Sequence, residues 1–220
     1  MDYIVIRGKK AKRLYREMSV FYCLFNAALL VLYAVKRDAY HFSVSIGTFA
    51  IPLLLELVWK LPFLHRVWQI DCLILGFVFI AYPLGSCLDL YLLLPGFDKA
   101  AHTLSGTFVS LLALILYYAL KPGHQIERRD ATLAAAFMFF ASMAVAGLWE
   151  INEYLLSGVV GRDLQRVALT GVADSMHDMI ACLAGTVAVI PIALRLCAGK
   201  TGVLSNAVRD AIALNFQSAL

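Results

Sequence analysis

The sequence predicts an all-α, polytopic membrane protein folded as a bundle of six transmembrane helices. Hydrophobic residues make up 61% of the 220 residues and charged residues 15%, and the mean hydropathy is +0.77. A soluble domain is about 45–50% apolar and about 25% charged. Apolar runs of about 20 residues recur along the chain, which is the length that a helix needs to cross the hydrocarbon of a bilayer. Because strand-like alternation is missing from the sequence, helices are favoured over a barrel.

The elements follow in a simple order. Residues 1–17 form a basic lead with six Lys and Arg residues, which suits the anionic cytoplasmic leaflet. Residues 87–97 are apolar but interrupted by Asp89 and a Pro-Gly pair, which indicates an interfacial or re-entrant connector. The tail, 197–220, has apolar residues at helical spacing and is expected to lie along the membrane as an amphipathic cytoplasmic segment. The transmembrane domain, 18–196, contains six predicted spans: about 18–35, 42–59, 67–86, 98–120, 131–156 and 171–196.

The basic residues orient this bundle. With the amino terminus inside, five of the 19 Lys and Arg residues lie on the outer side and the other 14 on the inner side. This positive-inside bias predicts an inner-membrane (cell-membrane) protein with both termini cytoplasmic. It also accounts for the basic residues without nucleic acid as a partner. Near the inner side, Glu56 and Asp71 are expected to pair with Lys60 and Arg66. The sequence makes no prediction of the oligomeric state.

Three stretches of the chain carry acidic residues and histidines at the ends of the predicted spans. Asp98 and His102 are four residues apart at the start of the fourth span, so they share a helix face. The other two stretches lie at the end of the fifth span and the start of the sixth, and they contribute Glu150, Glu153, Asp174, His177 and Asp178. The predicted topology brings all three stretches to the outer membrane boundary. His177 points about 100° away from Asp178 on an ideal helix but lies three residues after Asp174, so its membership of the group is left open.

Such a set of side chains is suited to a divalent metal. Carboxylates with one or two imidazoles bind Mg²⁺, Mn²⁺, Ca²⁺ or Zn²⁺, and helix bundles build such sites from pairs at these spacings. A bound ion can activate water for attack on an ester or phosphoester. We therefore predict a metal-dependent hydrolase acting on a lipid or lipid-linked substrate. The expected metal ligands or acid/base residues are Asp98, His102, Glu150, Glu153, Asp174 and Asp178, and the residues expected to bind a substrate anion are Lys99, Arg162 and Arg166.

Two other interpretations use the same residues. The acids and His102 could form a relay in a small transporter or ion-binding protein, because intramembrane acids commonly mark proton paths. That interpretation requires polar groups that continue to the inner side, and these are sparse in the inner halves of the last three spans. Alternatively, basic residues could neutralise the acids in a purely structural arrangement.

The three motifs together resemble the YjdF-like bacterial inner-membrane proteins and, more distantly, the VanZ-like proteins. The similarity covers about residues 67–196. It rests on DKxxHxxxG from Asp98, on WExxE from Trp149, and on Asp174, Asp178 and Gly185. The resemblance implies a polytopic membrane protein in which these residues matter, without specifying a reaction. At Cys182 the chain departs from the pattern, since such proteins tend to carry Asn or Asp there; a sulfur ligand would favour Zn²⁺ over Mg²⁺.

Overall fold

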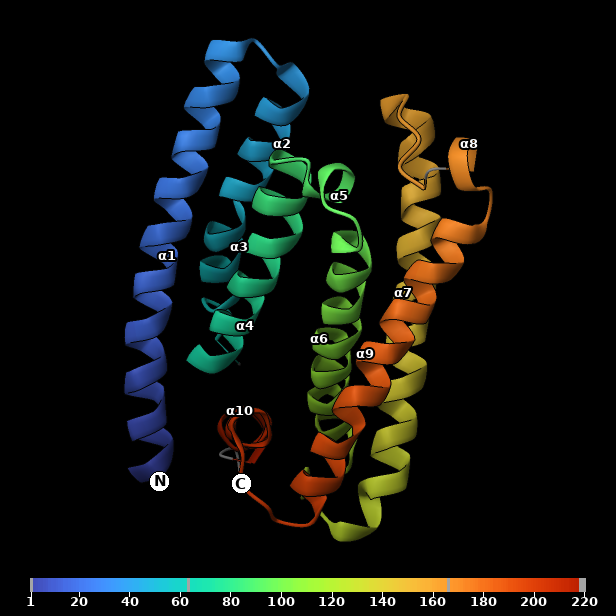
Figure 1. Cartoon of the computed structure of the whole chain (residues 1–220). Coiled ribbons are helices and arrows are strands. Elements are labelled where there is room, and N and C mark those ends of the chain that lie inside the picture. Colours follow the sequence, from blue (N-terminus) through green and yellow to red (C-terminus); the bar gives the residue numbers. More distant parts are fainter. Residues whose placement is uncertain (1, 63, 166, 218–220) are drawn as a thin grey trace. The chain divides into compact units, whose positions relative to one another are not determined.

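The computed structural model describes residues 2–62, 64–165 and 167–217, and within them every regular element is a helix. Two compact units can be distinguished. The first consists of the chain up to Phe97 together with the segment from Ala213, and the second is Asp98–Ile212. The fold is that of an all-α, multi-pass membrane protein (Figure 1). The predicted number of spans is confirmed, because six described segments are long and apolar enough to cross a membrane: Ile4–Lys36, Ala39–Val58, Trp68–Cys87, Phe97–Leu120, Arg128–Val160 and Ala173–Cys197.

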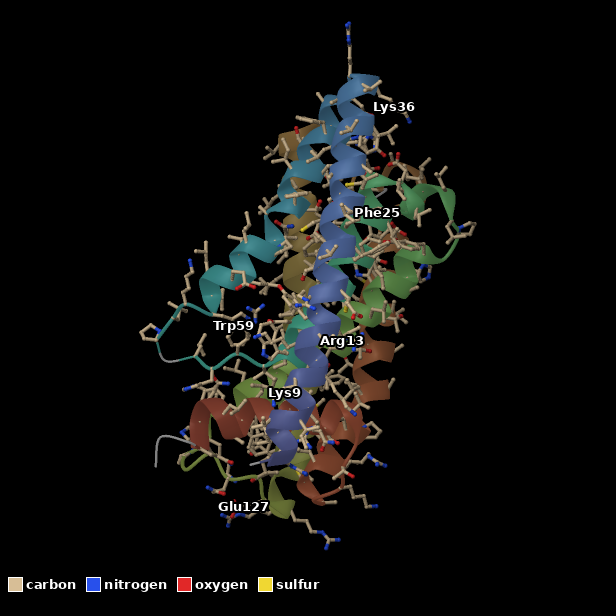
Figure 2. All side chains as sticks on the ribbon, turned by 90° about the vertical axis from the view of Figure 1, so that its left-hand side faces the viewer. Lys9, Arg13, Phe25, Lys36, Trp59 and Glu127 are labelled. Carbon is tan, nitrogen blue, oxygen red and sulfur yellow. The ribbon has the colours of Figure 1, made fainter. Side chains whose placement is uncertain are left out.

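The first helix, α1 (Asp2–Lys36), differs from the expectation of a separate basic lead. It continues without interruption from the basic residues into the first span. No proline breaks the segment, and Arg13 Nε pairs with Glu17 Oε1 at 2.9 Å, one helical turn away, where the lead was expected to end. Lys9 and Arg13 lie along the early turns of α1 and Lys36 lies at its opposite end (Figure 2). The basic lead and the first span are therefore one helix.

The remainder of the first unit is built from shorter helices. The second span is divided at Ala50 because Pro52, in the first turn of the following helix, cannot donate a backbone hydrogen bond. The predicted connector contains a single short helix, and Asp89 precedes it with a left-handed φ of 55°. The elements after α1 are α2 (Ala39–Phe49), α3 (Ile51–Val58), α4 (Trp68–Phe79), the π-helix η1 (Ile80–Cys87), α5 (Leu90–Leu93) and the π-helix η3 (Ala213–Gln217).

The core of the first unit forms where α1 packs against α2 and α4. Tyr22 is buried there against Leu75, and its hydroxyl donates to the Thr48 carbonyl at 2.7 Å. Arg66, in the loop between α3 and α4, forms ion pairs with both helices. Its Nε lies 2.5 Å from Asp71 Oδ2, and its Nη1 lies 2.8 Å from a Glu56 carboxylate oxygen. The predicted pairing of these two acids with Arg66 is thus confirmed.

The second unit contains the three helices that carry the polar motifs. Its elements are α6 (Phe97–Leu120), the 3-10 turn η2 (Arg128–Asp130), α7 (Ala131–Val160), α8 (Val167–Thr170), α9 (Ala173–Cys197) and α10 (Val203–Ile212). α7 packs along α9, and α10 packs against the end of α9. Leu114, Met138, Ala193 and Ile212 are fully buried in the core of this unit. The tail, expected to be an amphipathic segment along the membrane, contains the helix α10, and its apolar residues Val208 and Ile212 pack into this core.

Two glycines allow α6 and α9 to touch through their backbones. A Cβ on Gly106 would lie 2.0 Å from the Cys182 carbonyl oxygen, and a Cβ on Gly185 would lie 1.9 Å from the Thr103 carbonyl oxygen. Neither position could accept a side chain without moving a helix. Thr107 Oγ1 adds a hydrogen bond to the Gly185 carbonyl at 3.2 Å. This contact fixes the distance between the helices that carry Asp98 and Asp178.

A polar network closes the turn between α6 and α7, at the opposite end of the unit from these acids. Lys121 Nζ donates to Glu127 Oε2 at 2.6 Å and to Asp130 Oδ2 at 2.8 Å. Glu127 and Asp130 also form a reciprocal capping box at η2. The entry into α7 is therefore held by these charged side chains in addition to the apolar packing of Ile126 and Ala131 against the core.

Candidate metal centre

The second unit gathers the polar motifs at one of its ends. Asp98 and His102 lie in the first turns of α6, Asp174 and Asp178 in the first turns of α9, and Glu150 lies ten residues before the end of α7. The start of α6, the start of α9 and the end of α7 lie at the same end of the unit (Figure 1). This arrangement follows from an antiparallel order of α6, α7 and α9.

Asp98, His102 and Asp178 form the centre of this group. Each offers one possible ligand atom, and these atoms all lie within 4.8 Å of one another. His102 Nε2 is 3.6 Å from Asp98 Oδ1 and 3.5 Å from Asp178 Oδ1. The side chains of His102, Asp98 and Asp178 are 13%, 16% and 5% exposed, so a cation bound there would be largely shielded from solvent. Two carboxylates and an imidazole suit a divalent ion.

Lys99 lies beside this group and contacts three aspartates. Its Nζ donates to Asp174 Oδ1 at 2.7 Å, to Asp178 Oδ1 at 2.6 Å and to Asp98 Oδ2 at 3.1 Å. From the sequence, Asp174 is a candidate metal ligand and Lys99 a candidate for binding a substrate anion. In the structure these two side chains bind each other.

Cys182 lies near the His102 ring nitrogen that faces away from the aspartates. Its Sγ is 3.7 Å from His102 Nδ1, whereas Nε2 faces the two aspartates. Cys182 is buried, and its carbonyl is the group that meets Gly106 at the crossing of α6 and α9. The cysteine is therefore placed to orient the imidazole rather than to join the three ligand atoms.

Glu150 and Glu153 have hydrogen-bond partners outside the three-residue group. Gln165 Nε2 lies 3.3 Å from Glu150 Oε2 and 3.0 Å from the Glu150 carbonyl oxygen, and it also reaches Ser175 Oγ. Trp149 Nε1 donates to Glu153 Oε1 at 2.8 Å. Glu153 still interacts electrostatically with the aspartates of the cluster. Gln165 is a residue that sequence reasoning missed, because a single glutamine in a polar loop carries no motif.

The remaining sequence candidates lie around the edge of this region. Arg162 is exposed in the turn that follows α7, and His177 is exposed on α9. Arg166 lies outside the described residues. The three-residue group therefore draws on two of the predicted stretches, and the stretch at the end of α7 contributes none of its three ligand atoms.

These features define the class of protein: a multi-pass helical membrane protein with a cluster of aspartate and histidine at one end of three helices. The chain belongs to the family described as "Predicted membrane protein (DUF2238)", whose family model matches residues 18–198. The match covers all six spans apart from the basic turns of α1. No curated protein and no solved structure matches the chain.

Proposed function

We propose that this protein is a divalent-metal-dependent membrane hydrolase that acts on a lipid or lipid-linked substrate. The observation that carries this proposal is the convergence of Asp98, His102 and Asp178 within 4.8 Å. Catalytic metal sites commonly have three protein ligands and keep a further position for water or substrate. A purely structural site would be expected to close that position with another ligand.

The surrounding residues have distinct roles in this proposal. Asp98, His102 and Asp178 would hold the cation, which supplies Lewis acidity toward the scissile ester and toward water. Glu150 and Glu153 would accept and return the proton, since neither belongs to the three-ligand group and both come from the part of α7 toward the same end of the unit. Gln165 fixes the Glu150 carboxylate through one of its oxygens. Arg162, exposed next to this end of α7, would contact an anionic head group.

The substrate class follows from the position of the centre along the spans. The cluster lies in the first turns of α6 and α9, where a helix that crosses a bilayer passes the level of the lipid head groups. Together with the distribution of Lys and Arg, this position suggests a centre that faces the outer leaflet of the inner membrane, with both termini cytoplasmic. The motif resemblance to the YjdF-like proteins is compatible with this location.

The alternative to a hydrolase is a transporter or ion-binding protein that uses a proton relay, and one observation favours it. Thr186 Oγ1 donates to Ser142 Oγ at 2.8 Å, so buried hydroxyls continue from the cluster into the bundle. Beyond them, however, the core between α6, α7 and α9 is formed by the fully buried Leu114, Met138 and Ala193. A relay would have to cross this apolar layer, whereas a hydrolase needs a polar centre at one end only.

Elemental analysis tests the metal centre directly. The detergent-solubilised protein is incubated with Mn²⁺ or Zn²⁺, freed of excess ion and compared with His102→Ala, Asp178→Asn and Glu150→Gln. We expect about one ion per chain in the wild type and in Glu150→Gln, and none in the other two variants. A wild type without metal, or retention of the ion by both ligand variants, would overturn the proposal.

The reaction is tested with the same proteins. Lipid phosphoesters and esters are incubated with metal-loaded wild type and with metal-loaded Glu150→Gln, which removes only the proposed base. Loss of a general base lowers a rate by about 10²–10⁴-fold. Turnover by the wild type with this loss in Glu150→Gln is the expected result; equal rates would remove Glu150 from the mechanism, and no turnover of either substrate class would count against a lipid hydrolase.

A further inference from the structure

The ammonium of Lys99 occupies a position with the chemistry of a cation site. Three carboxylates from two helices surround Nζ, with oxygen atoms 2.6, 2.7 and 3.1 Å away. A lysine ammonium is a compact point charge with three donors, and here each donor has its own aspartate. The side chain is 32% exposed, while Asp174 and Asp178 are 10% and 5% exposed. The positive charge is thus held on carboxylates that are themselves mostly buried.

Two of these aspartates also belong to the proposed metal centre. Asp98 turns Oδ2 toward Lys99 and Oδ1 toward His102 Nε2, at 3.1 and 3.6 Å. Asp178 Oδ1 lies between the same two groups, 2.6 Å from Lys99 Nζ and 3.5 Å from His102 Nε2. Two adjacent cation positions therefore share two carboxylates. Centres that bind two metal ions have this arrangement, with the ions about 3.5–4 Å apart.

We propose that Lys99 is a built-in cation that fills the second position of a two-cation centre. The first position, at His102, takes a divalent ion; this part rests on the proposed function. The charges in direct contact support the assignment. Asp98, Asp174 and Asp178 are the three carboxylates that contact Lys99 and carry three negative charges, and one divalent ion with one ammonium carries three positive charges. Glu150 and Glu153 have hydrogen-bond partners outside this set, and balanced charge among the groups in contact is the least costly state within membrane spans. Lys99 thereby sets the number of metal ions that the centre binds.

The test is to remove the ammonium and count bound ions. Wild type and Lys99→Gln are loaded with Mn²⁺ in detergent, and the ions per chain are measured by elemental analysis and by electron paramagnetic resonance. We expect Lys99→Gln to hold one more ion per chain than the wild type, with the broadened spectrum of two neighbouring Mn²⁺ ions. An equal count in the two proteins would overturn the proposal. Lys200→Gln, which removes an exposed charge in the same unit, is the control and should not change the count.

A second variant locates the additional ion. Asp174 contacts the Lys99 position and is not part of the three-residue group at His102. Lys99→Gln combined with Asp174→Asn should therefore lose the additional ion and keep the first. If Lys99→Gln folds poorly, thermal unfolding is repeated with Mn²⁺ present. Recovery of a cooperative transition supports a vacated cation position, and failure to recover it overturns the proposal.

The outcomes separate this inference from the function on which it rests. One ion in the wild type and one in Lys99→Gln would contradict the role of Lys99 and leave the metal centre intact. No ion in the wild type and one in Lys99→Gln would contradict the metal-dependent hydrolase, yet would support Lys99 as a substitute for a cation. Lys99→Arg keeps the positive charge and should bind as many ions as the wild type.

Discussion

The contact between α6 and α9 leads to a sharp prediction for Gly185→Ala. The new Cβ would lie 1.9 Å from the Thr103 carbonyl oxygen, whereas ordinary contacts begin at 3.4 Å. The difference, 3.4 − 1.9 Å, requires the two helices to separate locally by about 1.5 Å. Because the obstacle is backbone, no side-chain rotation can relieve it. Overpacking of this kind costs about 1–3 kcal/mol, and we expect a loss near the upper end.

The separation should also affect the metal centre. Asp178 lies seven residues before Gly185 on the same helix face, and Asp98 lies on the helix that is displaced. We therefore expect Gly185→Ala to lose Mn²⁺ affinity together with stability.

Gly147→Ala in α7 is the matched control, because a Cβ there would meet no described atom within 4 Å. This change should leave stability equal to the wild type or about 0.5–1 kcal/mol higher, since alanine is the better helix former. Both variants are unfolded thermally in the same detergent, and Mn²⁺ binding is measured beside the wild type. If Gly185→Ala proved as stable as Gly147→Ala, the inferred backbone contact would be wrong.

Three further predictions concern polar contacts elsewhere in the chain. Arg66→Leu leaves the fully buried Asp71 without its guanidinium and should cost about 3–5 kcal/mol in thermal unfolding, whereas an unchanged midpoint would contradict a buried ion pair. The hydrogen bond from Lys121 lowers the pKa of Glu127 in the folded protein. The stability that Glu127 contributes is therefore present above its unfolded-state pKa and is lost as the pH falls through its folded-state pKa. Between about pH 5 and pH 3 the melting temperature should fall more steeply in the wild type than in Glu127→Gln. Thr186→Val removes a buried hydroxyl bond at nearly constant volume and should cost about 1 kcal/mol by the same unfolding measurement, and a gain in stability would refute that contribution.

The spans could be predicted because hydropathy and helix length depend on local sequence alone. The continuity of α1 could not be predicted in this way. The change from basic to apolar residues near Glu17 indicates a change of surroundings, but it contains no residue that ends a helix. Conversely, Pro52 divides a segment that hydropathy treats as one span. Composition therefore locates the membrane crossing, whereas backbone chemistry decides where each helix starts and stops.

Part of the candidate centre could be predicted for a similar reason. The spacing of Asp98 and His102 fixes their common face, and the order of the spans places Asp178 near the same end. The rotation of one helix against another is set by long-range contacts such as that of Gly106 with the Cys182 carbonyl. Sequence reasoning consequently identified stretches that lie at the same end of the unit in the structure, and it could not determine which acids contact His102 and which contact Lys99.

The uninterrupted course of α1 has a practical consequence for imaging. A chain of 24.3 kDa that is largely embedded in a micelle offers few features for aligning single particles. A helical fusion partner joined in register to the start of α1 would inherit the direction of that helix. Each residue added at the junction turns the partner by about 100° and advances it by about 1.5 Å, so a short series of junctions would sample its orientations around the first unit.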